Sequence, residues 1–176
     1  YKCLISFKKL KFSKTLIPKF DKSVDDRLPK RRWQNIRKKP EIVIFEGWCV
    51  GVTPQKKKDL LVPINELEKE KDKNRIWRLR VNKELKIEYK KIFKMIDNLI
   101  FLKVPSFKHV YKWRLLQEKK LKVTSKGKKT MKTEEIKNFI MFYERLTKYM
   151  LKNLPKTADV IVKIDGKHRL NSIKFN

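Results

Sequence analysis

The chain has 176 residues, 40% of them hydrophobic, which suffices for one domain of ordinary size with a buried core. Its 48 lysines and arginines outnumber 19 acidic residues, so the net charge is +29, and this argues for a polyanionic partner or for an extensively solvated surface. Neither a disulfide framework nor a metal cluster can be made from Cys3 and Cys49, and no apolar run is long enough to cross a bilayer, so we expect a cytoplasmic protein without a membrane role.

The excess of positive charge is concentrated in two segments. Residues 1–40 carry 14 basic and 3 acidic residues, and residues 105–132 carry 10 basic and 1 acidic residue. Either segment can face a phosphate-bearing ligand. A lysine-rich chain with a single alanine, Ala158, is also typical of an AT-rich genome. We therefore expect most of these lysines to be solvated, and we expect no specific nucleic acid as a partner.

The first half of the chain predicts a loop and then a strand. Residues 21–27 are polar and precede Pro29, which favours a loop. Residues 41–45 (EIVIF) are mostly β-branched and do not alternate with polar residues, a pattern typical of a strand buried on both faces of a parallel sheet. This strand is expected to end at Glu46 and Gly47.

The second half predicts helices and strands in alternation. Apolar residues at helical spacing indicate one or two helices over residues 65–96, and residues 98–104 indicate a second buried strand. Ser106 is expected to cap a helix that runs to about Val123, and residues 124–132 form a polar basic loop.

The last 44 residues predict one more helix and two strands. Thr133 is expected to cap a helix with Glu134 and Glu135 in its first turn, where the helix dipole favours acids. Residues 159–164 indicate a third buried strand, and a turn at Asp165 and Gly166 leads to a short final strand over residues 170–175. Strands separated by helices imply parallel crossovers, so the predicted fold is a three-layer α/β domain.

Three places in the sequence can carry chemistry. Glu46 follows a predicted strand, and ligands of open parallel sheets bind beyond the carboxyl ends of strands, so its carboxylate can bind Mg²⁺ or take a proton, unless it simply faces solvent. The loop over residues 21–27 carries three carboxylates and two cations, which can hold an acid substrate or pair with one another. Arg114 can reach a phosphate from its helix or merely pair with Glu118 at i+4. His109 and His168 are isolated in the sequence.

The string FEGWCVG (45–51) resembles the D-glycerate 3-kinase family of P-loop kinases, which is related in fold to uridine kinase, phosphoribulokinase and pantothenate kinase. Four further strings resemble the same family in order and spacing: IPKFDKSVDDR (17–27), NELEKEKDKNRIWRLRVNKEL (65–85), VPSFKHVYKWRLLQEKKL (104–121) and MFYERLTKYMLKNLPKTADVIVKID (141–165). The resemblance extends over nearly the whole chain.

The resemblance implies a P-loop kinase domain over residues 1–176 that transfers a phosphoryl group from ATP to a hydroxyl of D-glycerate. It implies a catalytic role for Glu46, which would also serve Mg²⁺, for Asp25, and for Arg114 as the arginine of a lid-side helix and basic loop over residues 105–132. It also implies that four residues shape the acceptor and phosphate side of the site, namely Asp21, Lys22, Asp26 and Arg27.

The sequence departs from this family at one important motif. No G-x-x-x-x-G-K-[ST] string occurs in it, and its four glycines lie at positions 47, 51, 127 and 166. The family carries this P-loop before the matched strings, so we expect the chain to be the later part of such an enzyme, without activity by itself. Two alternatives stay open: a related kinase whose acceptor is pantothenate or a nucleoside, and a non-catalytic basic domain that binds nucleic acid. The oligomeric state is not predicted.

Overall fold

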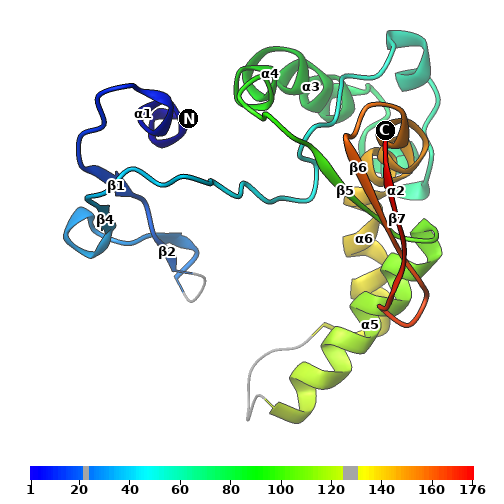
Figure 1. The fold of residues 1–176 in the computed structure, drawn as a ribbon. Coiled ribbons are helices and arrows are strands. Elements are labelled where there is room, and N and C mark those ends of the chain that lie inside the picture. Colours follow the sequence, from blue (N-terminus) through cyan, green and yellow to red (C-terminus); the bar gives the residue numbers. More distant parts are fainter. Residues whose placement is uncertain (22–23, 125–130) are drawn as a thin grey trace. The chain divides into compact units, whose positions relative to one another are not determined.

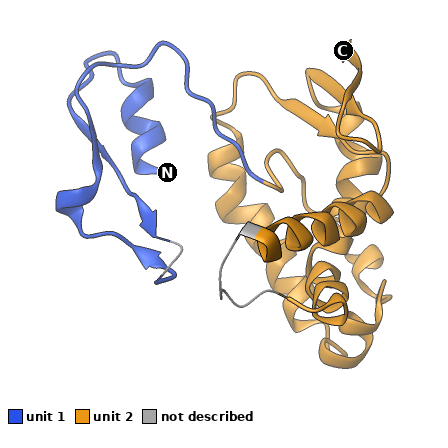
Figure 2. Cartoon of the chain, turned by 90° about the horizontal axis from the view of Figure 1, so that it is seen from below, with its two compact units in different colours: residues 1–47 blue, residues 48–176 orange. Residues whose placement is uncertain are grey.

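The fold is taken from a computed structural model that describes residues 1–21, 24–124 and 131–176. The chain forms two compact units, Tyr1–Gly47 and Trp48–Asn176, and each is described by itself (Figure 2). The single domain expected over residues 1–176 therefore stays a prediction.

Unit 1, residues 1–47, contains short elements only. They are α1 (Lys2–Lys8), β1 (Thr15–Ile17), β2 (Phe20–Asp21), β3 (Asp26–Arg27), η1 (Lys30–Arg32) and β4 (Gln34–Ile36). β1 pairs with β4 and β2 with β3, both antiparallel. Among the residues described in this unit only Thr15 is buried, and its hydroxyl lies 2.7 Å from that of Ser6, so α1 and β1 meet through a polar contact.

Two predictions for unit 1 need correction. Residues 41–45 form no strand: nothing in the described residues pairs with them, and Ile42 and Ile44 are 80% and 86% exposed. A β-branched run favours an extended backbone. A strand forms only where the backbone N–H and C=O groups of a neighbouring strand hydrogen-bond to it. The segment predicted as a loop begins and ends in the paired strands β2 and β3, and Lys22 lies outside the described residues.

Unit 2, residues 48–176, contains one three-stranded mixed sheet, visible in Figure 1. Its strands are β5 (Ile100–Lys103), β6 (Val160–Ile164) and β7 (Leu170–Phe175). β6 lies in the centre, parallel to β5 and antiparallel to β7. The three predicted strands in this half are thus confirmed, but the three-layer parallel sheet is not seen in the described part of the chain.

The sheet buries one face, whereas both faces were predicted to be buried. Phe101 and Ile161 pair across β5 and β6 and are 7% and 4% exposed, while Ile100 and Leu102 are 59% and 58% exposed. Since successive side chains of a strand point to opposite faces, only one face of this sheet is covered by the described residues of unit 2. A continuous apolar run does not reveal which of its two faces the chain covers.

The other elements described in unit 2 are helices. They are η2 (Lys57–Leu60), α2 (Glu66–Lys71), α3 (Ile76–Glu84), η3 (Leu85–Tyr89), α4 (Lys90–Phe93), α5 (Phe107–Thr124), α6 (Thr133–Asn153) and η4 (Leu154–Lys156). The predicted helices over residues 65–96, after Ser106 and around residue 140 are confirmed. No helix in the described residues is long and apolar enough to cross a membrane.

Ser106 directly precedes α5, as predicted, whereas the predicted cap at Thr133 is wrong and an unpredicted cap occurs at Asn65. The side chain of Asn65 caps α2 by accepting from the Glu68 N–H at 3.0 Å. Thr133 is the first residue of α6 and not its cap: Lys132 takes the cap position, and its N–H donates to the Glu135 carboxylate at 2.6 Å. A glutamate at the third helical position reaches back to the cap backbone, so the glutamates expected to favour the helix dipole also set the start of α6.

The core of unit 2 is built on α6. Its residues Leu146 and Met150 lie in one buried cluster with Phe101 and Ile161 of the sheet and Leu154 of η4. Buried positions recur along α6 at helical spacing, and they are Ile136, Ile140, Arg145, Leu146, Thr147 and Met150. The amphipathic pattern that predicted this helix therefore also identifies the face that packs on the sheet.

Candidate active site

The β2–β3 hairpin carries the acidic residues predicted on the acceptor side. Asp21 pairs with Asp26 across the two strands, and the Asp26 carboxylate accepts from the Arg27 N–H at 2.6 Å. Asp25 adopts a left-handed conformation with φ 52°, which aspartate tolerates better than most residues and which reverses the chain. The turn thus brings three carboxylates to one hairpin.

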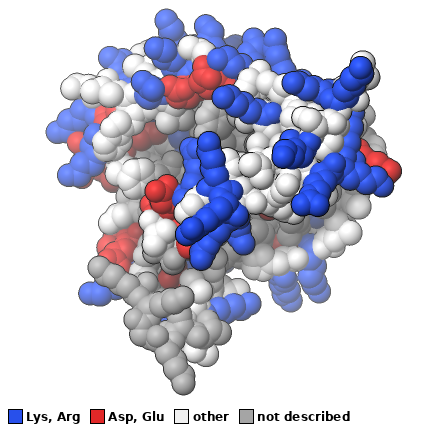
Figure 3. Space-filling model, turned by 90° about the vertical axis from the view of Figure 1, so that its left-hand side faces the viewer, with Lys and Arg blue, Asp and Glu red and all other residues white. Residues whose placement is uncertain are grey.

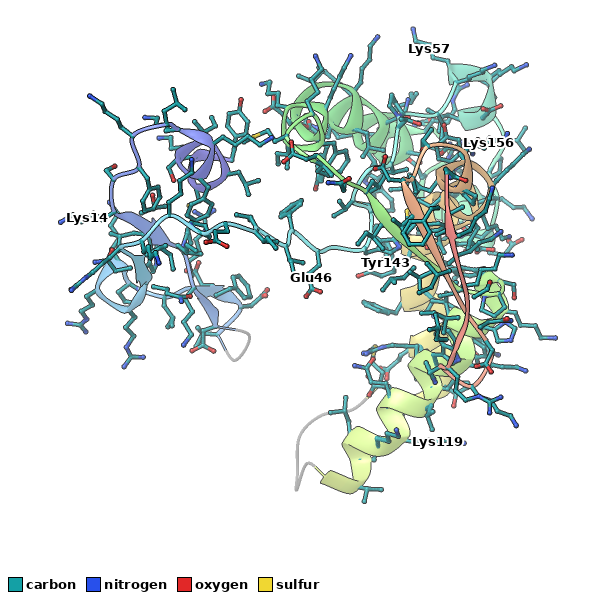
Figure 4. All side chains as sticks on the ribbon, viewed as in Figure 1. Lys14, Glu46, Lys57, Lys119, Tyr143 and Lys156 are labelled. Atoms are coloured by element: carbon teal, nitrogen blue, oxygen red, sulfur yellow. The ribbon has the colours of Figure 1, made fainter. Side chains whose placement is uncertain are left out.

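Glu46 lies at the end of the extended segment that follows residue 40, where Figure 4 labels it. The residue is exposed, and its carboxylate has no hydrogen-bond or ion-pair partner among the described residues. A free carboxylate suits Mg²⁺, which is usually held by one or two carboxylates together with water and substrate phosphates.

Arg114 on α5 is held by several groups of unit 2. Its Nη2 donates to Glu118 Oε1 and its Nη1 to Gln117 Oε1, both at 2.5 Å, and the guanidinium lies 5.4 Å from the centre of the Phe139 ring. Glu118 is 4% exposed, and its second oxygen accepts from the Met131 N–H at 3.2 Å. The Arg114–Glu118 pair predicted from the sequence is confirmed, and it fixes the guanidinium.

Arg114 retains unused donor capacity. A guanidinium has five N–H groups. Within the described residues Nη1 and Nη2 of Arg114 each donate one hydrogen bond, so each keeps a second N–H, and the side chain is 23% exposed. The group is thus oriented by protein contacts and can still donate to an anion. This is the arrangement expected of an arginine that contacts a phosphate.

An aromatic row on α6 was not predicted. Trp48 Nε1 donates to Thr147 Oγ1 at 3.0 Å, and the Trp48 ring lies edge-on to Tyr143, with 4.8 Å between ring centres. The ring centres of Tyr143 and Phe139 are 5.0 Å apart, and the Arg114 guanidinium lies over the Phe139 ring. The four-residue spacing of positions 139, 143 and 147 was the signal in the sequence, since such residues share one face of a helix.

The two histidines, which are isolated in the sequence, both contact Trp113. Ring centres of Trp113 and His168 are 4.0 Å apart, those of Trp113 and His109 are 6.2 Å apart, and the indole N–H donates to the Gly166 carbonyl at 3.2 Å. The sequence did not indicate this cluster because residues 109 and 168 belong to different elements, α5 and the β6–β7 turn. The cluster joins those elements; His109 also binds Ser106, whose hydroxyl lies 3.0 Å from its ring Nδ1.

Two buried ion pairs hold the helices of unit 2. Arg145 on α6 donates to both oxygens of Glu68 on α2 at 2.6 Å and to the carbonyls of Asp59 and Val62. Arg78 donates to the Asp72 carboxylate at 3.0 Å. Since all these groups are satisfied within the fold, we assign them to structure and not to the site.

The electrostatics of the described residues are dominated by exposed cations. Lys and Arg side chains protrude over much of the face seen in Figure 3, with fewer acidic groups between them.

Some side chains of unit 2 have shifted pKa values. Burial raises the pKa of the Cys49 thiol above its usual value. Hydrogen bonds from Arg169 and Lys167 lower the pKa of Asp165. No group of three or more His, Cys, Asp or Glu side chains in the described structure is placed to hold a metal.

The structure thus groups the predicted residues only in part. Asp21, Asp25, Asp26 and Arg27 share one hairpin of unit 1, as their closeness in sequence requires. Glu46 belongs to the same unit, and Arg114 belongs to unit 2. A site that unites them stays a prediction.

Comparison with known proteins relates the chain to kinases. It is 35% identical over 133 residues to the uncharacterized kinase mug58 of Schizosaccharomyces pombe, a match that covers 72% of this chain and 46% of that protein. It is 27% identical over 134 residues to the chloroplastic D-glycerate 3-kinase of Arabidopsis thaliana, covering 74% of this chain and 26% of that enzyme. No family model matches. The chain thus spans less than half the length of either relative.

Solved structures share the fold. The D-glycerate 3-kinase of Cryptococcus neoformans superimposes with a TM-score of 0.77 at 21% identity, over 99% of this chain and 65% of that one. The YGR205w protein superimposes with a TM-score of 0.68 at 22% identity, over 98% of this chain and 61% of that one. The chain is therefore related to a family of kinases that includes D-glycerate 3-kinase, over part of the length of its members.

Proposed function

We propose that this chain, as a relative of D-glycerate 3-kinases, forms part of an ATP-dependent kinase that phosphorylates a hydroxyl group of D-glycerate. The observation that carries the proposal is the sequence match to an enzyme of that name, and the FEGWCVG string around Glu46 supports it. The fold agrees with the proposal.

The residues of the chain suit the acceptor side and the charge-neutralising side of such a reaction. Phosphoryl transfer needs little covalent participation from the protein, and its catalysis depends mainly on positioning and on electrostatic stabilisation. Mg²⁺ bound to ATP would neutralise phosphate charge, and Glu46 offers the free carboxylate to hold the ion directly or through water.

We assign the hairpin to the acceptor. Asp25 would orient the glycerate hydroxyl and accept its proton, with Asp21 and Asp26 beside it on the paired strands. The cations Lys22 and Arg27 would attract the glycerate carboxylate or a phosphate. Arg114, fixed by Glu118, would donate to the transferred phosphoryl group.

The 176 residues do not supply the phosphate-binding loop of a P-loop kinase. They contain no G-x-x-x-x-G-K-[ST] string, so the proposed roles include no residue that cradles the β- and γ-phosphates.

The test is a coupled ADP-release assay with ATP, Mg²⁺ and D-glycerate on the full-length natural protein that carries this chain. We expect Asp25→Asn, Glu46→Gln and Arg114→Ala each to lower kcat by roughly 10²–10³-fold, as loss of a group that acts on the transition state does. Glu41→Gln and Lys119→Ala serve as controls at exposed positions of the same segment and helix, and they should leave kcat unchanged. Circular dichroism should show every variant folded.

Three results would revise the proposal. Near-normal kcat in one of the three variants removes that residue from the site. Transfer to pantothenate or to a nucleoside, with none to D-glycerate, reassigns the acceptor. Absence of transfer to all three acceptors by the wild-type protein overturns the proposal.

A further inference from the structure

The start of unit 2 is held on helix α6 by several contacts: Val52 packs in the buried cluster with Met150, and Trp48 makes the contact nearest in sequence to Glu46. The Trp48 indole N–H donates to the Thr147 hydroxyl at 3.0 Å, and the ring lies edge-on to Tyr143. Thr147 is only 6% exposed, whereas Trp48 is 42% exposed. A tryptophan so exposed gains less from burial than a core residue does, so the directional hydrogen bond is the distinctive part of this contact.

The same face of α6 also supports Arg114. Its guanidinium lies 5.4 Å from the centre of the Phe139 ring, a distance at which a cation is attracted to the face of an aromatic ring. Phe139, Tyr143 and Thr147 follow one another at four-residue spacing, and at 1.5 Å per residue they extend over about 12 Å of the helix. Hence one rigid element holds Trp48 at one end and Arg114 at the other.

Trp48 limits the position of Glu46 through the backbone. Glu46 precedes Trp48 by two residues, and consecutive Cα atoms are 3.8 Å apart, so the two Cα atoms lie within about 7 Å of each other. This limit follows from covalent geometry and holds wherever the rest of unit 1 lies. Gly47, between them, places no side chain against either neighbour.

We propose that the face of α6 formed by Phe139, Tyr143 and Thr147 is a positioning surface for phosphoryl transfer, which holds Glu46 through Trp48 and holds Arg114 directly. This inference rests on the proposed function, because it assumes that Glu46 and Arg114 act on the reacting groups. Trp48, Tyr143 and Thr147 are then positioning residues, and their replacement lowers turnover by displacing Glu46. A displacement of about 1 Å can cost up to roughly 10²-fold in rate.

The experiment compares two substitutions of Thr147 in the full-length protein. Thr147→Val keeps the shape of the side chain and removes the hydroxyl that accepts from Trp48, whereas Thr147→Ser keeps the hydroxyl. We expect Thr147→Val to lower kcat about tenfold with an unchanged KM for ATP, and Thr147→Ser to stay within about twofold of the wild type. Thr133→Val is the control, because Thr133 is exposed at the start of the same helix.

A second measurement does not depend on activity. Amide hydrogen exchange of Val52, whose N–H donates to the Cys49 carbonyl at 3.2 Å in the turn after Trp48, should be faster in Thr147→Val than in the wild type and normal in Thr147→Ser, while the amides of β5 and β6 keep their protection in both. Protection of the sheet shows that the core is intact, so faster exchange at Val52 reports local loosening of this turn.

The outcomes separate this inference from the proposed function. Unchanged exchange at Val52 in Thr147→Val, or unchanged kcat despite faster exchange, overturns the inference and leaves the kinase assignment intact. The inference is supported if kcat falls in Thr147→Val and stays near the wild-type value in Thr147→Ser. Absence of transfer by the wild-type protein overturns the proposed function and, with it, the catalytic role given to this surface.

Discussion

The two units differ in how far their apolar residues are buried. Every apolar residue that is buried in the described structure belongs to unit 2. There α6 packs against the paired strands β5 and β6, and both contribute to one buried cluster. Unit 1 has apolar residues in quantity, but its sheets have two short strands each, and isolated two-stranded pairs are marginal in water. Apolar composition therefore produces a core only where the chain also provides an opposing face.

The strongest test of this contrast compares two large apolar side chains. Phe101→Ala removes a ring from the buried cluster of unit 2 and should lower the free energy of unfolding by about 3–5 kcal/mol. Ile44→Ala, at a side chain 86% exposed, should change it by no more than about 0.5 kcal/mol. Urea denaturation followed by circular dichroism measures both. A cost above 2 kcal/mol for Ile44→Ala would show that residues 41–45 are packed in the folded protein, against the contrast drawn here.

A second comparison stays within helix α2 of unit 2. Glu68 pairs with Arg145 where both side chains are nearly buried, while Glu66 pairs with Lys69 where both are 66% exposed. Glu68→Ala leaves a buried guanidinium without its counter-ion and should cost about 3 kcal/mol, whereas Glu66→Ala should cost less than about 0.5 kcal/mol. If urea denaturation shows equal losses of unfolding free energy for the two variants, burial does not determine how much each ion pair stabilises the fold.

The third prediction concerns the carboxylate in the β6–β7 turn. Asp165 accepts from the backbone N–H groups of Arg169 and Lys167 and from the Arg169 side chain, and these bonds lower its pKa. Because the pKa in the folded state lies below that in the unfolded state, the contribution to stability is complete above the unfolded pKa and is lost as the pH falls through the folded pKa. Carbon-13 NMR titration should place the Asp165 midpoint below that of an aspartate in an unstructured peptide. A midpoint equal to the peptide value would show that the turn does not hold this carboxylate in solution.

The smallest expected effect is on a thiol. Burial raises the pKa of Cys49, so less of it is thiolate near pH 8, and we expect iodoacetamide to modify it more slowly than a cysteine in an unstructured peptide. The Cys3→Ser variant isolates this signal, and the rate should rise to the peptide value in urea. An equal rate in the folded state would place Cys49 outside the packed part of unit 2.

Local patterns predicted most of unit 2 correctly. α5 and α6 follow from apolar residues at helical spacing, and β6 and β7 from short apolar runs around the turn at Asp165 and Gly166. These signals suffice because helix periodicity and turn formation depend on residues near one another in the chain. The Arg114–Glu118 pair was predictable for the same reason, since its members lie on adjacent turns of one helix.

The failures share one physical cause. Residues 41–45 have the sequence of a buried strand, yet nothing local can tell whether another strand lies beside them. The contacts of the two histidines were missed for the same reason, because Trp113 joins His109 on its own helix to His168 in the β6–β7 turn. The aromatic row was missed because Trp48 meets Thr147 from 99 residues away.

The sequence by itself determined the helices, the strands of unit 2, the excess of positive charge and the closeness of Asp21, Asp25 and Asp26 in one short segment, because each depends on neighbours in the chain. The resemblance to D-glycerate 3-kinases was also visible in the sequence, and the comparisons confirmed that relationship. The tertiary structure alone decided which face of the sheet is covered, which histidines contact Trp113, and where Trp48 is anchored. Those outcomes depend on residues that come together from distant parts of the chain. The local sequence is compatible with several such contacts, and the packing of the whole unit decides which of them form.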